Sequence, residues 1–525
     1  MISTTLFTNA NIPSTHTQHE NSLLVQDGRI VFIGETGQVH ELAPAGTPEI
    51  DLNGKTILPG LCDFHLHLAN LAEKLDAVDC ETESPTECLA RVSEKAKITP
   101  AGEWIIGYGW NHNAWQPAEY GTAAQLDAIS LEHPIFLHAK SLHAAWVNTM
   151  AMRSGRIDRN TPNPEGGVIL RDTNGEPTGI LLENAAFLSS DHLPEPTPEV
   201  SAQKILRAQS YLHSLGLTAA HDFDRFESAE ALLLLAERGQ LKMRITKNLP
   251  SEEIDRVISE NWREKLTCPP FIQPGWLKVF ADGALGPQSA AMLDPYEGSR
   301  NRGMLLLKAA HLAELGLQAG FAGWPLAVHA IGDWAVREVL DGFSLLRERE
   351  RENGLPPLPH RIEHVQIIQP ADRERMKKLG VIASVQPIHA TSDYLTADHH
   401  WGKRSQYAYA YQSLLQEKIV VRFGSDAPVE SPDPFLGIHA AVTRQRQDGE
   451  PGPGGWYPQE RVSLYQAIHA YTQPLPGNGT ADLLSAGMPA DFIILEQDPF
   501  MVDSAELAGF KPIMTVVAGE VVFGR

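Results

Sequence analysis

Residues 59–67 read Pro-Gly-Leu-Cys-Asp-Phe-His-Leu-His, the sharpest local motif of the chain. Its apolar run predicts a β-strand. Because residues i and i+2 of a strand point to the same face, His65 and His67 can present two imidazoles to one ion. Neutral imidazole suits a borderline ion such as zinc. Two histidines that bind nothing are the plainer interpretation, and the motif alone leaves it open because His-x-His is common.

Three further apolar runs end in a side chain of a metal-binding type. Residues 326–329, 361–364 and 423–426 end in His329, His364 and Asp426. A (β/α)8 barrel carries its catalytic residues at the carboxyl ends of its strands. Each residue alone is also explained as a core residue or a helix cap. Four strand ends in order, all with ligand-type side chains, indicate one site.

The spacing of apolar runs predicts an α/β fold, a (β/α)8 TIM barrel over residues 58–474. We expect its strands near residues 60–67, 218–223, 243–249, 276–281, 325–329, 361–366, 381–386 and 419–424, with helices such as 198–215 and 333–353 between them. The gap between the first two strands is far longer than a normal crossover. It therefore predicts an inserted subdomain over about residues 70–205.

Both ends of the chain predict β-hairpins. Asp27-Gly28 and Ala518-Gly519 are turn signals between apolar runs, and residues 490–495 form another apolar run. Neither end has a core of its own. We therefore expect residues 1–57 and 475–525 to form one small β-sandwich together.

Composition excludes several classes of function. The chain has 525 residues, 42% of them hydrophobic and 21% charged, which is ordinary for a globular protein. A net charge of −22 disfavours nucleic acid and anionic membranes as partners. Four cysteines without a CxxC pair, no apolar run long enough for a membrane span and no signal-peptide pattern predict a cytoplasmic protein.

The ordered set of histidines and aspartate resembles the amidohydrolase superfamily. Within it, the chain is similar to the amidohydrolase 3 (YtcJ-like) branch, which includes N-substituted formamide deformylase. The motifs that carry this likeness span nearly the whole chain: HAAWVN (143–148), GGVILRDTNGEPTGILLE (166–183), WLKVFADGALG (276–286), VHAIGD (328–333), RIEHVQ (361–366), SVQPIH (384–389), FGSDAPVESPDPF (423–435) and GMPADFIIL (487–495).

The resemblance implies one or two divalent ions, with zinc the expected metal, held by His65, His67, Lys278, His329, His364 and Asp426. A free ammonium inside a barrel is expensive, so Lys278 is expected as a carbamate that bridges two ions. An ion pair between Lys278 and Asp282 or another carboxylate is the alternative. Glu183 is a second candidate for an acidic ligand. With one ion, we expect His364 to bond the water or the substrate instead.

The expected chemistry is attack of activated water on a carbonyl carbon. Asp426 is expected to act as general base and then acid, and His364 with the ion to stabilise the oxyanion. Side chains expected to contact the substrate are Trp110, His143, Asp282, Gln386, His389 and Arg404. Burial in the core of the subdomain explains Trp110 equally well.

The favoured substrate is a small N-acyl or N-formyl compound. Gly332 stands where related deaminases tend to carry a glutamate, which counts against nucleobase deamination. A lactonase or cyclic imide hydrolase is the alternative on the same scaffold. A non-catalytic regulator that binds small molecules is disfavoured, because none of the ligand positions is missing. A homodimer is common in such folds, but the sequence leaves the oligomeric state open.

Overall fold

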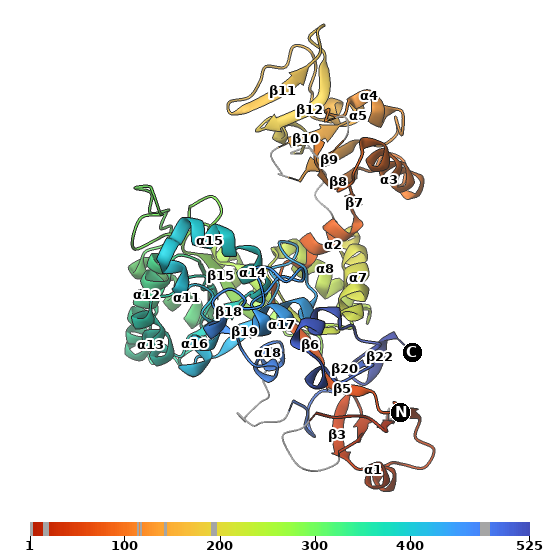
Figure 1. Ribbon diagram of the computed structural model, residues 1–525, viewed down its shortest axis with the longest axis vertical. Coiled ribbons are helices and arrows are strands. Elements are labelled where there is room, and N and C mark those ends of the chain that lie inside the picture. The colour runs from red at the N-terminus through yellow and green to blue at the C-terminus, as the bar shows by residue number, and fades with distance from the viewer. Residues whose placement is uncertain are drawn as a thin grey trace. The chain divides into compact units, whose positions relative to one another are not determined.

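Eight parallel strands form the central sheet of the computed structural model (Figure 1). They follow one another in the sheet in chain order: β6 (Leu61–Leu66), β13 (Leu217–Asp222), β14 (Arg244–Pro250), β15 (Ile272–Phe280), β16 (Leu326–Ala330), β17 (Arg361–His364), β18 (Ile382–Val385) and β19 (Val421–Phe423). A parallel bridge between Leu66 and Ala427 joins the first strand to the end of the last. Each predicted run overlaps one of these strands, so the predicted barrel fold is confirmed.

Helices cover the outside of this barrel (Figure 1). The longest is α12 (Asp333–Glu352), which buries Val336, Val339, Leu340 and Phe343. That spacing places one apolar stripe against the sheet. The other helices of this part of the chain are α7 (Pro198–Ser214), α8 (Phe226–Glu237), α9 (Ile254–Ser259), α10 (Trp262–Lys265), α11 (Ala309–Phe321), α13 (Pro370–Leu379), α14 (Pro387–Ser392), α15 (Tyr394–Trp401), α16 (Tyr411–Gln416), α17 (Pro434–Thr443) and α18 (Leu464–Ala470).

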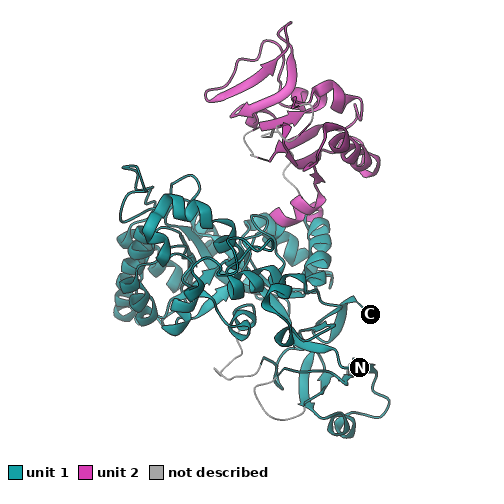
Figure 2. Ribbon diagram, viewed as in Figure 1, with its two compact units in different colours: residues 1–69, 201–525 teal, residues 70–200 magenta. Residues whose placement is uncertain are grey.

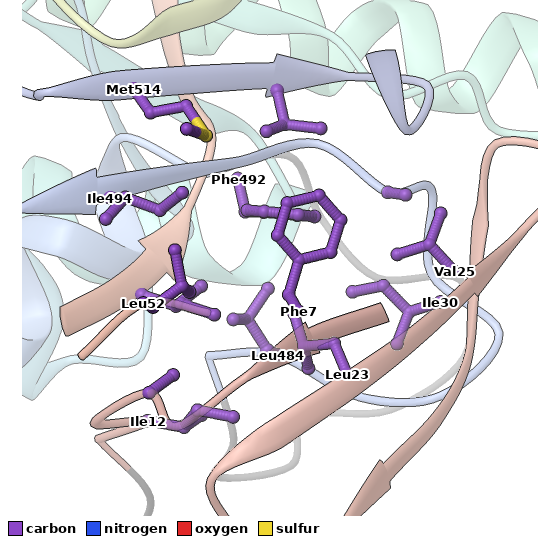
Figure 3. Packing of buried hydrophobic residues seen from close by; sticks show 14 residues of the cluster. Phe7, Ile12, Leu23, Val25, Ile30, Leu52, Leu484, Phe492, Ile494 and Met514 are labelled. Carbon is purple, nitrogen blue, oxygen red and sulfur yellow. The ribbon is translucent and has the colours of Figure 1, made fainter. Parts of the chain in front are cut away.

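Two four-stranded sheets from the two ends of the chain pack face to face. One contains β1 (Thr4–Thr8), β2 (Ser22–Gln26), β3 (Arg29–Gly34) and β4 (Glu49–Asp51), and the other β5 (Thr56–Pro59), β20 (Phe492–Leu495), β21 (Met514–Val517) and β22 (Glu520–Gly524). Figure 3 shows their shared core, in which Phe7 of one sheet meets Phe492 of the other edge to face, 4.9 Å between ring centroids. The helix α1 (Thr36–Leu42) follows β3. The expected sandwich of both termini is therefore present.

Residues 70–200 form a separate compact unit (Figure 2). Its six-stranded sheet contains β7 (Val78–Asp79), β8 (Ile105–Trp110), β9 (Ile135–Ala139), β10 (Ala144–Val147), β11 (Gly167–Arg171) and β12 (Pro177–Glu183). The helices are α3 (Pro85–Ile98), α4 (Ala123–Asp127), α5 (Thr149–Ser154) and α6 (Phe187–Ser190), and α2 (Leu68–Asp76) leads into the unit. Trp110, Trp115 and Trp146 are fully buried in one apolar cluster of this unit.

The structure describes residues 4–13, 20–112, 115, 118–140, 144–190, 197–472 and 483–524. In this part of the chain no helix combines the length and the apolarity needed to cross a membrane.

Candidate metal centre and active site

Polar side chains converge where the barrel strands end. His65 lies one residue before the end of β6, and His67 directly follows the strand. Lys278 lies near the end of β15, His329 on β16 and His364 at the end of β17, while Asp426 follows β19. The amide nitrogen of Asp426 donates to the carbonyl oxygen of His65 at 2.6 Å. This backbone bond fixes the eighth strand end beside the first.

His65, His67 and Asp426 form one donor set that fits a metal ion. The Nε2 atoms of both histidines lie 3.5 Å from the same carboxylate oxygen of Asp426. Two ligands of a tetrahedral zinc ion, each about 2.0–2.1 Å from it, are roughly 3.4 Å apart. The spacing of these atoms therefore suits zinc coordination.

Two further carboxylates orient these imidazoles. Nδ1 of His65 lies 2.6 Å from Glu363, and Nδ1 of His67 lies 3.2 Å from Asp224. A carboxylate accepts the proton of Nδ1, which leaves the lone pair of Nε2 free for an ion. Burial lowers the pKa of His67, but its hydrogen bonds to Asp224 and Asp426 outweigh this and raise it to about 9. The surroundings therefore favour positive charge at this place.

Glu363 is itself held by Arg361, and both side chains are buried. Arg361 also donates to the carbonyl oxygen of Phe64 at 2.7 Å and contacts Ser384. Burial raises the pKa of Glu363, yet the positive charge of Arg361 brings it well below its usual range. The carboxylate that orients His65 is therefore ionised.

Lys278 is buried against the first donor set. Its Nζ lies 3.5 Å from Nε2 of His65 and 4.8 Å from the ring centroid of Phe223. Burial lowers the pKa of the amine to about 8. Among the described residues Lys278 forms no ion pair, and the alternative pairing with Asp282 is not what the structure contains. Burial therefore leaves a neutral, nucleophilic fraction of this amine near neutral pH.

His329 and His364 lie side by side, 4.6 Å between ring centroids. Nε2 of His329 lies 3.0 Å from the carbonyl oxygen of Gly283, so this nitrogen carries a proton. Nδ1 of His364 lies 2.9 Å from Oε1 of Gln386. Burial lowers the pKa of both imidazoles, to about 4 for His329, and both rings are neutral.

A second donor set joins His364 and Asp426 to His389. His389 lies on α14, directly after β18, with 7% of its surface exposed. Its ring is nearly parallel to that of His364, 6.4 Å away. Asp426 therefore belongs to both donor sets found among the described residues.

The remaining predicted substrate contacts have structural partners. The carboxylate of Asp282 is buried and accepts the backbone N–H groups of Ala291, Ile331 and Gly332. Burial raises its pKa to about 7. The guanidinium of Arg404 donates to the backbone carbonyls of Trp401, Asp294 and Pro295. These bonds give both side chains a role in fixing loops, and their contact with substrate stays a prediction.

Three predicted residues belong to other parts of the chain. Trp110 packs in the core of residues 70–200, where its indole N–H donates to the carbonyl of Leu137 at 2.8 Å. Glu183 ends β12 in that same unit and is exposed. His143 lies outside the described residues. Substrate contacts of Trp110 and His143 stay predictions.

The carboxylates that orient the histidines are not among the residues predicted from the sequence. Glu363 directly precedes His364, and the alternation of a strand places it on the opposite face, with Arg361. Asp222 is the last residue of the second barrel strand and pairs with buried Lys247 at 2.7 Å, and Asp224 lies two residues further on. Acidic residues at that strand end were the available signal.

An eight-stranded parallel barrel with two histidine and aspartate donor sets at its carboxyl edge defines a metal-dependent hydrolase. The chain belongs to the amidohydrolase family, whose Amidohydro_3 model it matches over residues 48–523.

Relatives agree with this assignment. The chain is 32% identical to "Putative amidohydrolase YtcJ" of Bacillus subtilis (strain 168), with 96% of each chain covered. It is 28% identical to "Protein LONG AFTER FAR-RED 3" of Arabidopsis thaliana, covering 96% of this chain and 88% of that protein. Identity to "N-substituted formamide deformylase" of Arthrobacter pascens is 26%, with 98% of each covered. An uncharacterized metal-dependent hydrolase from Pyrococcus horikoshii OT3 superposes with a TM-score of 0.78 at 26% identity, over 96% of this chain and 99% of that one.

Proposed function

We propose that this protein hydrolyses the carbon–nitrogen bond of a small N-acyl or N-formyl compound. The observation that carries the proposal is the donor set of His65, His67 and Asp426, whose facing atoms have the separation that zinc ligands adopt. The relative named N-substituted formamide deformylase supports an amide substrate. A complete donor set supports an enzyme over a regulator that only binds.

His65, His67 and Asp426 would hold a divalent ion, which would supply a nucleophile by lowering the pKa of bound water from about 15.7 to about 7. Zinc is the proposed metal, since imidazole and carboxylate donors in this arrangement suit it. The carboxylates of Glu363 and Asp224 keep the two imidazoles in the tautomer that faces inward.

Asp426 is the proposed proton carrier. Its carboxylate belongs to both donor sets, the one with His65 and His67 and the one with His364 and His389. In the proposed reaction it takes a proton from the attacking water and delivers it to the leaving amine nitrogen. His364 shares a donor set with Asp426, and its Nδ1 is held by Oε1 of Gln386. Its proposed role is to stabilise the oxyanion together with the ion.

Lys278 is proposed to carry a carbamate. The lone pair of its neutral amine forms a bond to the carbon of carbon dioxide, and the amine proton leaves to solvent. Burial without an ion pair supports this step, because the pKa of the amine is low enough to leave a neutral fraction near neutral pH. Carbon-13 bicarbonate labelling of the wild type should give a carbamate resonance that is absent in Lys278→Met. An active, metal-loaded enzyme without this resonance would remove the carbamate.

The hydrolase proposal is tested by metal removal and a substrate panel. Exhaustive chelation should abolish turnover of N-formyl and N-acyl amines, and zinc should restore it. The double variant His65→Ala/His67→Ala should stay inactive after zinc is added, whereas His311→Ala, an exposed histidine on α11, should match the wild type. Full activity after chelation would refute the metal mechanism. Faster turnover of lactones or cyclic imides than of amides would replace the proposed substrate.

A further inference from the structure

A cavity of about 290 Å³ lies between the helices that follow the last two barrel strands. Its lining includes Ile388 and Thr391 of α14, and Leu436 and His439 of α17. Small-molecule sites in proteins begin at about 300 Å³, so this cavity has room for a small ligand. None of the residues of the two donor sets lines it, so it is not part of the candidate metal centre.

The imidazole of His439 is buried in the wall of this cavity without a partner. Only 4% of the residue is exposed, and among the described residues no hydrogen bond or ion pair reaches its ring nitrogens. Burial lowers the pKa of the ring, so it is neutral and offers one N–H group and one lone pair. Buried polar atoms of native proteins nearly always have a partner. The ring therefore points to a polar ligand in the cavity.

The charge of the lining disfavours an anion. Glu430 lines the cavity, and its carboxylate forms no ion pair or hydrogen bond within the described part of the chain. Arg446 also lines it, but its guanidinium lies 2.8 Å from the carboxylate of Asp448. Barrels of this kind frequently bind phosphate beside the loops after the seventh and eighth strands. Here the lone carboxylate and the paired arginine favour a positively charged ligand instead.

The neighbouring polar atoms mostly accept hydrogen bonds. Oγ1 of Thr391 donates to the carbonyl oxygen of Ile388 at 2.9 Å and keeps its lone pairs. Nε2 of Gln445 donates to the carbonyl oxygen of Gly452, which leaves Oε1 of that amide as an acceptor. A metal ion lacks ligands here, because both groups of three metal-binding side chains among the described residues lie elsewhere. A cation with several N–H donors fits this lining better.

We infer that this cavity binds a small primary amine as its ammonium ion. Glu430 pairs with the positive charge, a ring nitrogen of His439 accepts one N–H group, and Ile388 and Leu436 contact a short alkyl chain. An amine is also the product that the proposed hydrolysis releases. Binding at this cavity needs no turnover, however, so the inference does not rest on the proposed function.

Titration with n-butylammonium tests the site. Saturation-transfer NMR on the full chain should show saturable binding, and Glu430→Gln should weaken it about tenfold, because a hydrogen bond between charged groups is lost. Glu314→Gln removes the same charge from an exposed position on α11 and should bind like the wild type. 1-Butanol has the same chain length without the charge and should also bind about tenfold more weakly than the ammonium ion.

Amines also coordinate zinc, so the titration is repeated after exhaustive chelation, and binding should remain. Crystals soaked with n-butylammonium provide a test without a variant and should place its nitrogen about 2.7–2.9 Å from the carboxylate of Glu430. The inference is overturned by absent binding, by wild-type binding in Glu430→Gln, by loss of binding with the metal, or by equal binding of 1-butanol or inorganic phosphate. These outcomes leave the proposed function unchanged, because metal removal and the substrate panel test it separately.

Discussion

The carboxylate of Glu363 should set the metal affinity of the centre without touching the ion. It accepts from Nδ1 of His65 at 2.6 Å and is fully buried beside Arg361. Removing such an orienting partner typically costs about 10–100-fold in metal affinity, roughly 1.4–2.7 kcal/mol. Glutamine keeps a neutral acceptor, so we expect about tenfold for Glu363→Gln and about a hundredfold for Glu363→Ala.

Stability should fall in the same variants. Breaking a buried ion pair costs about 3–5 kcal/mol. Arg361 keeps its bonds to Phe64 and Ser384 and a 3.0 Å contact with Nδ1 of His221, which places the expected loss near about 3 kcal/mol. Competition with a chelator of known zinc affinity measures the first effect, and chemical denaturation of metal-free protein measures the second.

Glu350 provides the matched control. It is also buried, and its carboxylate lies 2.7 Å from Arg347 and 3.4 Å from His360, which precedes the amino end of β17. Glu350→Gln should destabilise the protein but leave zinc affinity unchanged. A wild-type zinc affinity in Glu363→Ala, with only the stability loss seen at Glu350, would refute the orienting role of this carboxylate.

Three further outcomes follow from other parts of the molecule. Phe7→Ala should lower the free energy of unfolding by about 3–5 kcal/mol because the ring is fully buried against Phe492, and equal melting temperatures of variant and wild type would contradict this. Burial lowers the pKa of His213 to about 4, whereas in the unfolded chain this histidine binds its proton as pH falls below about 6.5. Lowering the pH from 7 to 5 should therefore reduce the free energy of unfolding of the wild type by about 2 kcal/mol more than that of His213→Leu. Urea titrations at both pH values measure this difference, and parallel pH profiles would exclude it. Asp282→Asn should cost about 1–3 kcal/mol, since an amide cannot accept all three backbone N–H groups, and a raised KM without any loss of stability would instead indicate direct substrate contact.

The barrel and its donor residues could be predicted because both leave local signals. Apolar runs of strand length mark β6 and its neighbours, and ligand-type side chains such as His364 stand at their ends. The partners that orient those ligands could not be predicted from spacing. His65 meets Glu363 across 298 residues of chain, and only the closed sheet brings them together.

The sequence also leaves two interpretations of Trp110 open, substrate contact and core packing. A tryptophan in a glycine-rich strand fits both, and the sequence favours neither. Burial of three tryptophans in one cluster with their indole N–H groups bonded to backbone carbonyls gives it a packing role. His389 shows the opposite case: the sequence predicts it as a substrate contact, and only the structure shows that its ring is buried with neither nitrogen bonded to a described residue.

The sandwich built from both termini also governs the order of events during synthesis. Nδ2 of Asn11 donates to Asp498 at 2.8 Å, 487 residues further along the chain. At about 5–20 residues per second, the ribosome needs roughly 25–100 s to deliver that partner. The apolar face of β1 and β2 stays exposed to solvent for this time. The strand β5, which leads directly into β6, lacks its neighbour β20 until translation is almost complete. The first strands made are thus among the last to be covered, so nascent chains stalled before residue 492 should expose this face to chaperones.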